Sequence, residues 1–184
     1  IQPPNNGSAI TSLLSELGFQ PSSLELAPAA SLVLDLTPTE DKILSQMKRQ
    51  TRQNIHRSER EGIIVRDGNA GDLDIFYKLH ISTSQRQRFP PYSLRYFQRL
   101  WNVFEPKGHI GLFLAEYKQT PVSALLIIPF GDTVIAKILG WSGEYSQLRP
   151  NDAIFWHAIQ WSKLYGYQYF DFEGINLQGA KAIL

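Results

Sequence analysis

Three consecutive strand-like segments in the middle of the chain constrain its fold more than any other feature. They are residues 109–117, 122–130 and 133–141. Each segment is rich in β-branched and aliphatic side chains, and short polar turns separate them, so the pattern predicts a meander of antiparallel hairpins. Apolar residues before and after these segments recur at helical spacing, which predicts flanking helices.

Helices and single strands are predicted on both sides of the meander. We expect a strand at 32–36, a long helix at 38–61, a strand at 63–65, helices starting near Asp72 and at Ser93, a helix at 150–165 and a strand at 167–172. Thr37, Pro38 and Glu40 predict that the long helix begins with a capping box, and Gly62 predicts its end. This order predicts an α+β fold with a mostly antiparallel sheet.

The first 30 residues differ from the rest of the chain. They contain four prolines and one short helical segment at 8–17 before Gly18. This stretch carries too little apolar surface to form a core. We therefore expect residues 1–30 to be a linker or the tail of a preceding domain, and residues 31–184 to form the folded domain.

The composition limits the classes of function. The formal net charge is +1, so a surface for nucleic acid would require local clustering of basic residues. The absence of cysteine excludes disulfides and thiolate zinc sites, and the four histidines lack metal-ligand spacing, so no metal site is predicted. No apolar run approaches the ~20 residues of a membrane span. A cytoplasmic protein is expected.

Several segments, in their order and spacing, resemble a known family. Residues 47–57 (MKRQTRQNIHR) follow the strand that ends at Thr37, and residues 148–156 (LRPNDAIFW) precede 165–172 (YGYQYFDF). Together they resemble the second GNAT domain of the Fem-type peptidoglycan bridge aminoacyltransferases, a branch of the GNAT-fold acyltransferase superfamily. The resemblance covers about residues 31–175. Generic GNAT-fold N-acyltransferases share most of these features.

The resemblance implies a GNAT-like sheet flanked by helices in a protein of two such domains. It implies aminoacyl-tRNA as the donor, a muropeptide or lipid-linked peptidoglycan precursor as the acceptor, and no cofactor. We expect a monomer at the inner face of the membrane. The domain at 31–184 would be truncated at its C-terminus, because a segment rich in Lys, Phe and Gly normally follows. Glu173 departs from the family, which has a small residue before the glycine.

Two carboxylates on the last strand are the candidate catalytic residues. Alternation along a strand places Phe170 and Phe172 on one face, and Asp171 and Glu173 on the other. If the phenylalanines lie in the core, the carboxylates face the open side, where one of them can accept the proton of an attacking amine. The alternative is a solvated strand end with Asp171 capping a turn.

Arginines and a tryptophan are the candidate substrate-binding residues. Arg86 and Arg88 lie near a helix end before Pro90, and a guanidinium suits bidentate phosphate capture. The resemblance implies that Arg86 contacts the phosphate of the nucleotide-linked muropeptide, whereas a surface ion pair is the alternative. Trp141 lies at a strand end and can line the substrate cleft, although a place in the core also fits it.

The long helix carries a candidate surface for nucleic acid. Lys48, Arg52, His56 and Arg60 recur at i+4 spacing, and Arg49 and Arg57 lie beside them. A basic helix face suits a polyanion such as tRNA. Glu59 and Glu61 dilute the charge, so an ordinary solvated face is the alternative. We assign Lys48, Arg49, Arg52 and Arg57 as the nucleic-acid-binding residues.

The turn at 147–153 argues against coenzyme A as the donor. Pyrophosphate binds at a helix N-terminus through free backbone N–H groups, but this turn has no glycine, Pro150 lacks an N–H, and Asp152 would repel phosphate. Two alternatives to aminoacyl transfer stay open. They are an N-acyltransferase that uses acyl-CoA or acyl-carrier protein, and a non-catalytic module that binds glycan or peptide.

Overall fold

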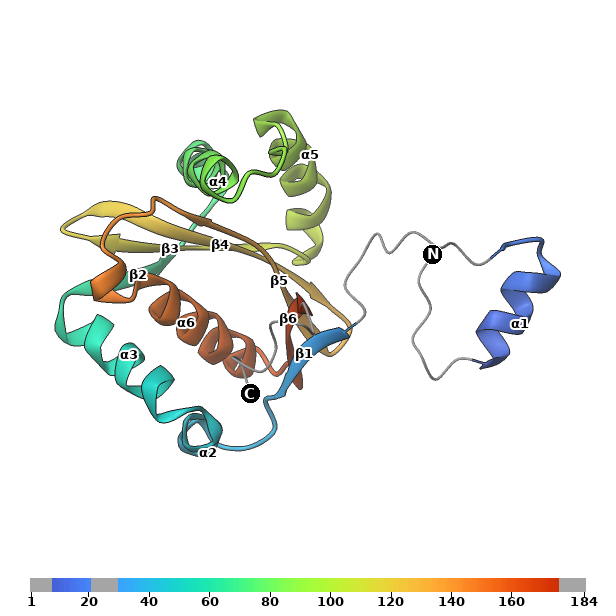
Figure 1. The fold of residues 1–184 in the computed structure, drawn as a ribbon, viewed down its shortest axis with the longest axis horizontal. Coiled ribbons are helices and arrows are strands. Elements are labelled where there is room, and N and C mark those ends of the chain that lie inside the picture. Colours follow the sequence, from blue (N-terminus) through green and yellow to red (C-terminus); the bar gives the residue numbers. More distant parts are fainter. Residues whose placement is uncertain (1–7, 21–29, 176–184) are drawn as a thin grey trace.

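The computed structural model describes residues 8–20 and 30–175 (Figure 1). The strands are β1 (Ala30–Asp35), β2 (Ile63–Asp67), β3 (Gly111–Tyr117), β4 (Thr120–Phe130), β5 (Thr133–Trp141) and β6 (Tyr169–Ile175). The helices are α1 (Ser8–Glu16), α2 (Glu40–Gln46), α3 (Arg49–Arg60), α4 (Leu73–Gln87), α5 (Leu94–Phe104) and α6 (Pro150–Leu164), with short 3₁₀ turns at Ala70–Asp72, Glu105–Lys107 and Ser146–Leu148. The predicted order of strands and helices is confirmed except at 38–61, where two helices replace the single one expected. None of the helices among the residues that the structure describes could span a lipid bilayer.

The six strands form one sheet in the order β1-β6-β5-β4-β3-β2. Every neighbouring pair is antiparallel except β5 and β6, which are parallel because α6 crosses between them. The meander β3-β4-β5 is present as predicted. Its first turn places Lys118 (φ 49°) and Gln119 (φ 64°) in the left-handed region, the geometry that matches the twist of paired strands.

Helices cover both faces of the sheet, so the central strands are buried on both sides (Figure 1). One face packs against α2, α3 and α6, where Ile43, Ile55 and Ile154 are at most 2% exposed. The other face packs against α4 and α5 through Phe76 and Phe97, which are fully buried. The predicted α+β class with a mostly antiparallel sheet is therefore confirmed.

The single long helix predicted at 38–61 is wrong, because the chain breaks between α2 and α3. Met47 (ψ 154°) and Lys48 (ψ 144°) are extended rather than helical. On one straight helix, Ile43 and Ile55 would point about 120° apart, yet both are buried in the same core. The break re-aims α3 so that both side chains reach the sheet.

The predicted cap of this region is also displaced. Thr39, not Thr37, is the N-cap, and its hydroxyl accepts a hydrogen bond from the backbone N–H of Lys42 at 3.3 Å. The N–H of Thr37 instead donates to Asp35 Oδ1 at 2.9 Å. Because the Asp35 side chain holds Thr37 in a turn after β1, the helix begins two residues later than predicted, after Thr39.

Candidate functional site

The site forms where the two parallel strands diverge. β5 and β6 pair only from Thr133 with Tyr169 to Ile135 with Asp171. Beyond this point β5 continues beside β4, and β6 continues beside β1. The sheet therefore opens next to Asp171, and the first turn of α6 follows the far end of β5.

A β-bulge on β5 directs a lysine toward this opening. Leu126 of β4 pairs with Ile138, whereas Ile127 pairs with Ala136, so Lys137 is the extra residue. The ammonium of Lys137 forms an ion pair with Glu173 across the opening. Both side chains are more than a third exposed, so the pair contributes at most about 1 kcal/mol to stability.

The last strand has the predicted alternation. Phe170 is fully buried, and the ring of Phe172 lies 5.0 Å from it between centroids. Asp171 and Glu173 lie on the other face and are half-buried. Asp171 Oδ1 accepts the backbone N–H of Glu173 at 2.8 Å, and Glu173 has φ 61°. Asp171 therefore supports a local turn beside the opening.

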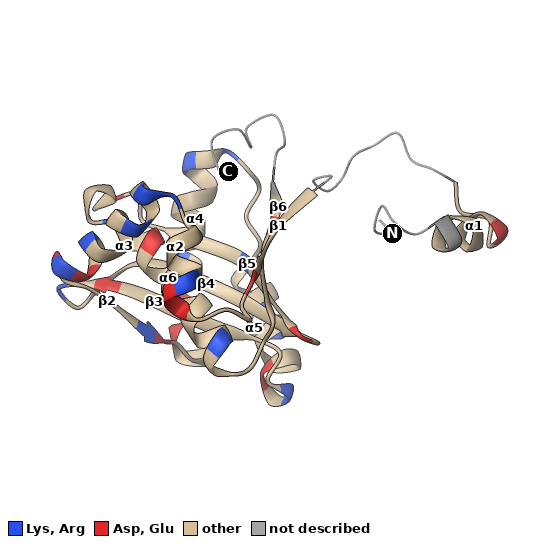
Figure 2. Cartoon of the chain, turned by 90° about the horizontal axis from the view of Figure 1, so that it is seen from below, with Lys and Arg blue, Asp and Glu red and all other residues tan. Residues whose placement is uncertain are grey.

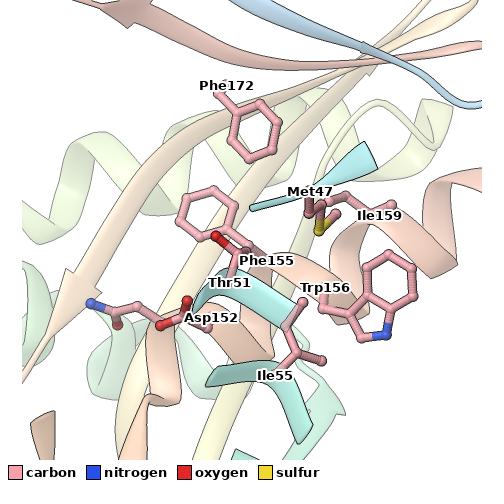
Figure 3. Close-up of a pocket in the computed structure, with 9 residues that line it drawn as sticks. Met47, Thr51, Ile55, Asp152, Phe155, Trp156, Ile159 and Phe172 are labelled. Carbon is pink, nitrogen blue, oxygen red and sulfur yellow. The ribbon is translucent and has the colours of Figure 1, made fainter. Parts of the chain in front are cut away.

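An apolar pocket lies between α3, α6 and β6 (Figure 3). Its volume is about 260 Å³. The lining residues are Met47, Thr51, Ile55, Asn151, Asp152, Phe155, Trp156, Ile159 and Phe172. Such a space holds part of a ligand rather than a whole one. Phe172 lines the pocket, whereas its neighbour Asp171 lies on the other face of β6, beside the opening.

The polar edge of the pocket is the first turn of α6. Asp152 Oδ1 accepts a hydrogen bond from the amide of Asn54 at 3.1 Å. Asn151 Oδ1 lies 2.8 Å from the hydroxyl of Ser123, which is buried. Arg149 precedes the helix in the left-handed region (φ 59°), and Pro150 is its first residue. The site thus presents a carboxylate, stabilised by the helix dipole, where an acyl-CoA enzyme presents free N–H groups.

Arg86 and Trp141, predicted separately, lie together. The guanidinium carbon of Arg86 is 4.5 Å from the centroid of the Trp141 ring, and Nη2 donates to the Trp141 carbonyl at 3.1 Å. The N–H of Trp141 donates to the hydroxyl of Thr83 at 2.8 Å, which ties β5 to α4. Arg88 takes a left-handed conformation (φ 58°) at the end of α4, and the described contacts of the Arg86–Trp141 pair do not include it.

Lys and Arg gather along α3, coloured blue in Figure 2. Lys48 is the N-cap residue of α3, and Arg49 and Arg57 are exposed. The guanidinium of Arg52 donates to the carbonyls of Ser45 (3.4 Å) and Met47. Arg52 therefore satisfies carbonyls at the end of α2, whereas Arg49 and Arg57 are exposed and better placed to meet an external anion.

Sequence reasoning did not find the pocket or Lys137. The pocket draws its residues from the region of α3 and from α6 and β6, and the hydrogen-bonded residues Asn54 and Asp152 of these two parts are 98 positions apart in the chain. Lys137 reaches the opening only because of the bulge. Nothing in a strand pattern marks either feature. The described residues contain no group of three His, Asp or Glu side chains that could hold a metal ion.

A family model described as "Acetyltransferase (GNAT) domain" matches residues 45–181. Lipid II:glycine glycyltransferase of Staphylococcus epidermidis is 23% identical over 125 residues, which are 64% of this chain and 30% of that protein. The enzyme of the same name from Staphylococcus haemolyticus is 24% identical over 116 residues, 59% of this chain and 28% of that protein. The chain thus spans less than a third of the length of these relatives.

Solved structures show the same fold. The crystal structure of FemX has a TM-score of 0.80 at 15% identity, covering 92% of this chain and 60% of that chain. The C-terminal domain of a putative lysylphosphatidylglycerol synthetase from Agrobacterium fabrum has a TM-score of 0.63 at 14% identity, covering 91% and 51%. At these identities the likeness concerns the fold alone.

Proposed function

The chain belongs to the acetyltransferase (GNAT) domain family, and from this premise we propose that it carries out aminoacyl transfer in peptidoglycan bridge formation. The donor in this proposal is an aminoacyl-tRNA, and the acceptor is an amine of a lipid-linked or nucleotide-linked muropeptide. The curated relatives are named for glycyl transfer to lipid II, which supports this acceptor class. Because the chain spans less than a third of their length, the activity of the whole protein is part of the proposal.

The start of α6 is the observation that carries the choice of donor. Pro150 has no N–H, and Asp152 places a negative charge in the first turn. A pyrophosphate at this helix end would lose a donor and meet a carboxylate, so coenzyme A fits poorly. An aminoacyl ester brings an α-ammonium instead, which a carboxylate attracts.

The apolar pocket would receive the aminoacyl end of the donor. Its volume of about 260 Å³ suits a small side chain and part of the terminal ribose. Asp152 lies at its polar edge, where it would bind the α-ammonium. In this placement the ester carbonyl lies near Phe172 and the opening between β5 and β6, within reach of an amine from the other side.

The reaction would proceed by attack of the acceptor amine on the ester carbonyl. An N–C bond forms, the C–O bond to the tRNA breaks, and the ribose oxygen leaves with a proton. The attacking nitrogen loses a proton, and Asp171 or Glu173 would accept it. Lys137, which is paired with Glu173, would stabilise negative charge that develops on the carbonyl oxygen.

Arg86 would position the acceptor. Its stacking on Trp141 and its bond to the carbonyl hold the guanidinium plane in place. A fixed guanidinium binds a diphosphate with less loss of conformational entropy than a free one. This supports the phosphate-binding role that the family resemblance implies for Arg86.

Titration calorimetry of this chain with acetyl-CoA tests the choice of donor. We expect no saturable heat at concentrations where acyl-CoA enzymes are saturated, because the first turn of α6 lacks the anion site. A stable amide analogue of an aminoacyl-adenosine is the comparison ligand. A dissociation constant for acetyl-CoA in the low micromolar range would contradict the proposal.

A further inference from the structure

Helix α5 exposes a surface that the proposed reaction does not use. Tyr96, Arg99 and Val103 recur at i, i+3 and i+7, so they share one face. All three are exposed. The opposite face carries Phe97 and Trp101, which are buried against α4 and the sheet. Helix α5 is therefore firmly docked, and apolar and basic side chains remain on its outer side.

Aromatic side chains extend this surface ahead of the helix. Phe89, Tyr92 and Tyr96 are 36%, 52% and 38% exposed. The rings of the two tyrosines are stacked, with centroids 4.5 Å apart. Two hydrogen bonds fix the backbone of residues 89–92 to α4. The N–H of Tyr92 donates to His80 Nε2 at 3.3 Å, and the hydroxyl of Ser84 donates to the carbonyl of Phe89 at 2.5 Å.

The segment that carries these side chains is basic. Residues 75–104 contain five Lys or Arg residues and no Asp or Glu, in a chain whose totals are 18 basic and 17 acidic residues. Arg95 and Arg99 are exposed on α5 one turn apart. Neither takes part in an ion pair within the part of the chain that the structure describes. Exposed apolar side chains beside two arginines that form no ion pair in the described structure indicate an interaction surface.

We propose that this surface, formed by Phe89, Tyr92, Arg95, Tyr96, Arg99 and Val103, docks on an anionic lipid bilayer. Tyrosine rings lie at the level of lipid headgroups, and guanidinium groups bind lipid phosphates. Val103 provides aliphatic area, which a lipid interface buries and on which a nucleic-acid base does not stack. The basic surface of α3 lies on the opposite side of the sheet (Figure 1). A tRNA bound to α3 would therefore not compete with a lipid bilayer bound to α5.

The inference rests on the proposed function in one respect: docking on a bilayer would bring the domain to a lipid-linked acceptor. Binding to vesicles requires neither donor nor acceptor. Lipid binding and aminoacyl transfer can therefore be tested separately. A protein that transfers aminoacyl groups but does not bind vesicles would support the proposed function and contradict this inference.

Co-sedimentation with lipid vesicles tests the proposal. We expect this chain to bind vesicles made of equal parts phosphatidylglycerol and phosphatidylcholine, and to bind phosphatidylcholine vesicles far more weakly. Replacing both Arg95 and Arg99 with Gln should weaken partitioning roughly 30-fold, at about a tenfold loss per 1.4 kcal/mol. Tyr96→Ser should weaken it further by removing the aromatic anchor. All three positions are exposed, so circular dichroism should show an unchanged fold.

The matched control replaces Arg57 and Arg60 of α3 with Gln, which removes the same charge from the other side of the sheet. Partitioning of this control should equal that of the unmodified chain. Equal losses in both double variants would show attraction by net charge alone and overturn the proposal. It would also be overturned if mixed vesicles fail to bind, or if the Arg95 and Arg99 changes abolish RNA binding and leave vesicle binding intact.

Discussion

At the scale of single residues, the carboxylates of β6 show why position and role must be tested separately. Strand alternation predicted that Phe170 lies in the core and Asp171 on the other face, and both placements are confirmed. The role of Asp171 stays a prediction, because its bond to the N–H of Glu173 suits a turn cap as well as a proton acceptor.

Asp171→Asn separates these two roles. The amide oxygen of Asn can accept the Glu173 N–H, so the melting temperature should stay nearly unchanged. If Asp171 accepts the proton of the amine, the transfer rate of the intact protein should fall about 10²–10⁴-fold. Asp132→Asn, which alters an exposed turn carboxylate, is the control and should keep full activity. A folded and fully active Asp171→Asn protein would remove this residue from the mechanism.

His80 makes stability depend on pH. It is 2% exposed among the rings of Phe76, Phe89, Tyr92 and Phe97, and desolvation lowers its pKa below the ordinary value of about 6.5. The folded state therefore binds this proton less readily than the unfolded state. The free energy of unfolding should be unaffected by His80 above about pH 6.5 and should fall as the pH decreases below that value.

Urea unfolding from about pH 8 to about pH 5 measures this contribution. His80→Gln, which keeps an acceptor for the Tyr92 N–H, should lose stability less steeply toward low pH than the unmodified chain. The three other histidines are common to both proteins, so the difference between the two curves belongs to His80. Parallel curves would show that His80 does not contribute.

At the scale of helices and strands, the break between α2 and α3 is a feature that local sequence patterns did not predict. The helix start at Ser93, the helix end at Gly62 and the meander turns were predictable because neighbouring residues determine them. The break was not, because it arises from the need of Ile43 and Ile55 to reach one core. It also gives Arg52 a structural role at the end of α2 that the basic stripe did not indicate.

We expect different roles for two arginines of α3: Arg57 in binding tRNA and Arg52 in stability. Arg57→Gln should weaken binding of tRNA and lower the slope of log affinity against log salt by up to about one unit, without changing the melting temperature. Arg52→Gln should lower stability by about 1 kcal/mol, because it releases the carbonyls of α2. Lys78→Gln on α4 is the control for net charge. Unchanged affinity and slope in Arg57→Gln would assign α3 to ordinary solvated surface.

At the scale of the whole molecule, the Fem-type resemblance and the acyltransferase class are confirmed by the family model and by the glycyltransferase relatives. The order of elements made the fold predictable. The candidate site was predictable only in part: Asp171, Arg86 and Trp141 lie at the ends of predicted elements, whereas the pocket residues meet through packing of α3 on α6. Contacts between distant segments leave no periodic signal in a sequence.

The donor decides between aminoacyl transfer and the alternative acyl-CoA chemistry of the family. The intact protein that carries this domain can be given one muropeptide acceptor and either aminoacyl-tRNA or acetyl-CoA, and the acylated acceptor can be quantified by mass spectrometry. We expect product that depends on both enzyme and aminoacyl-tRNA, and none above the enzyme-free level from acetyl-CoA. Acetylation of the acceptor at a rate equal to or above that of aminoacyl transfer would contradict the proposed function.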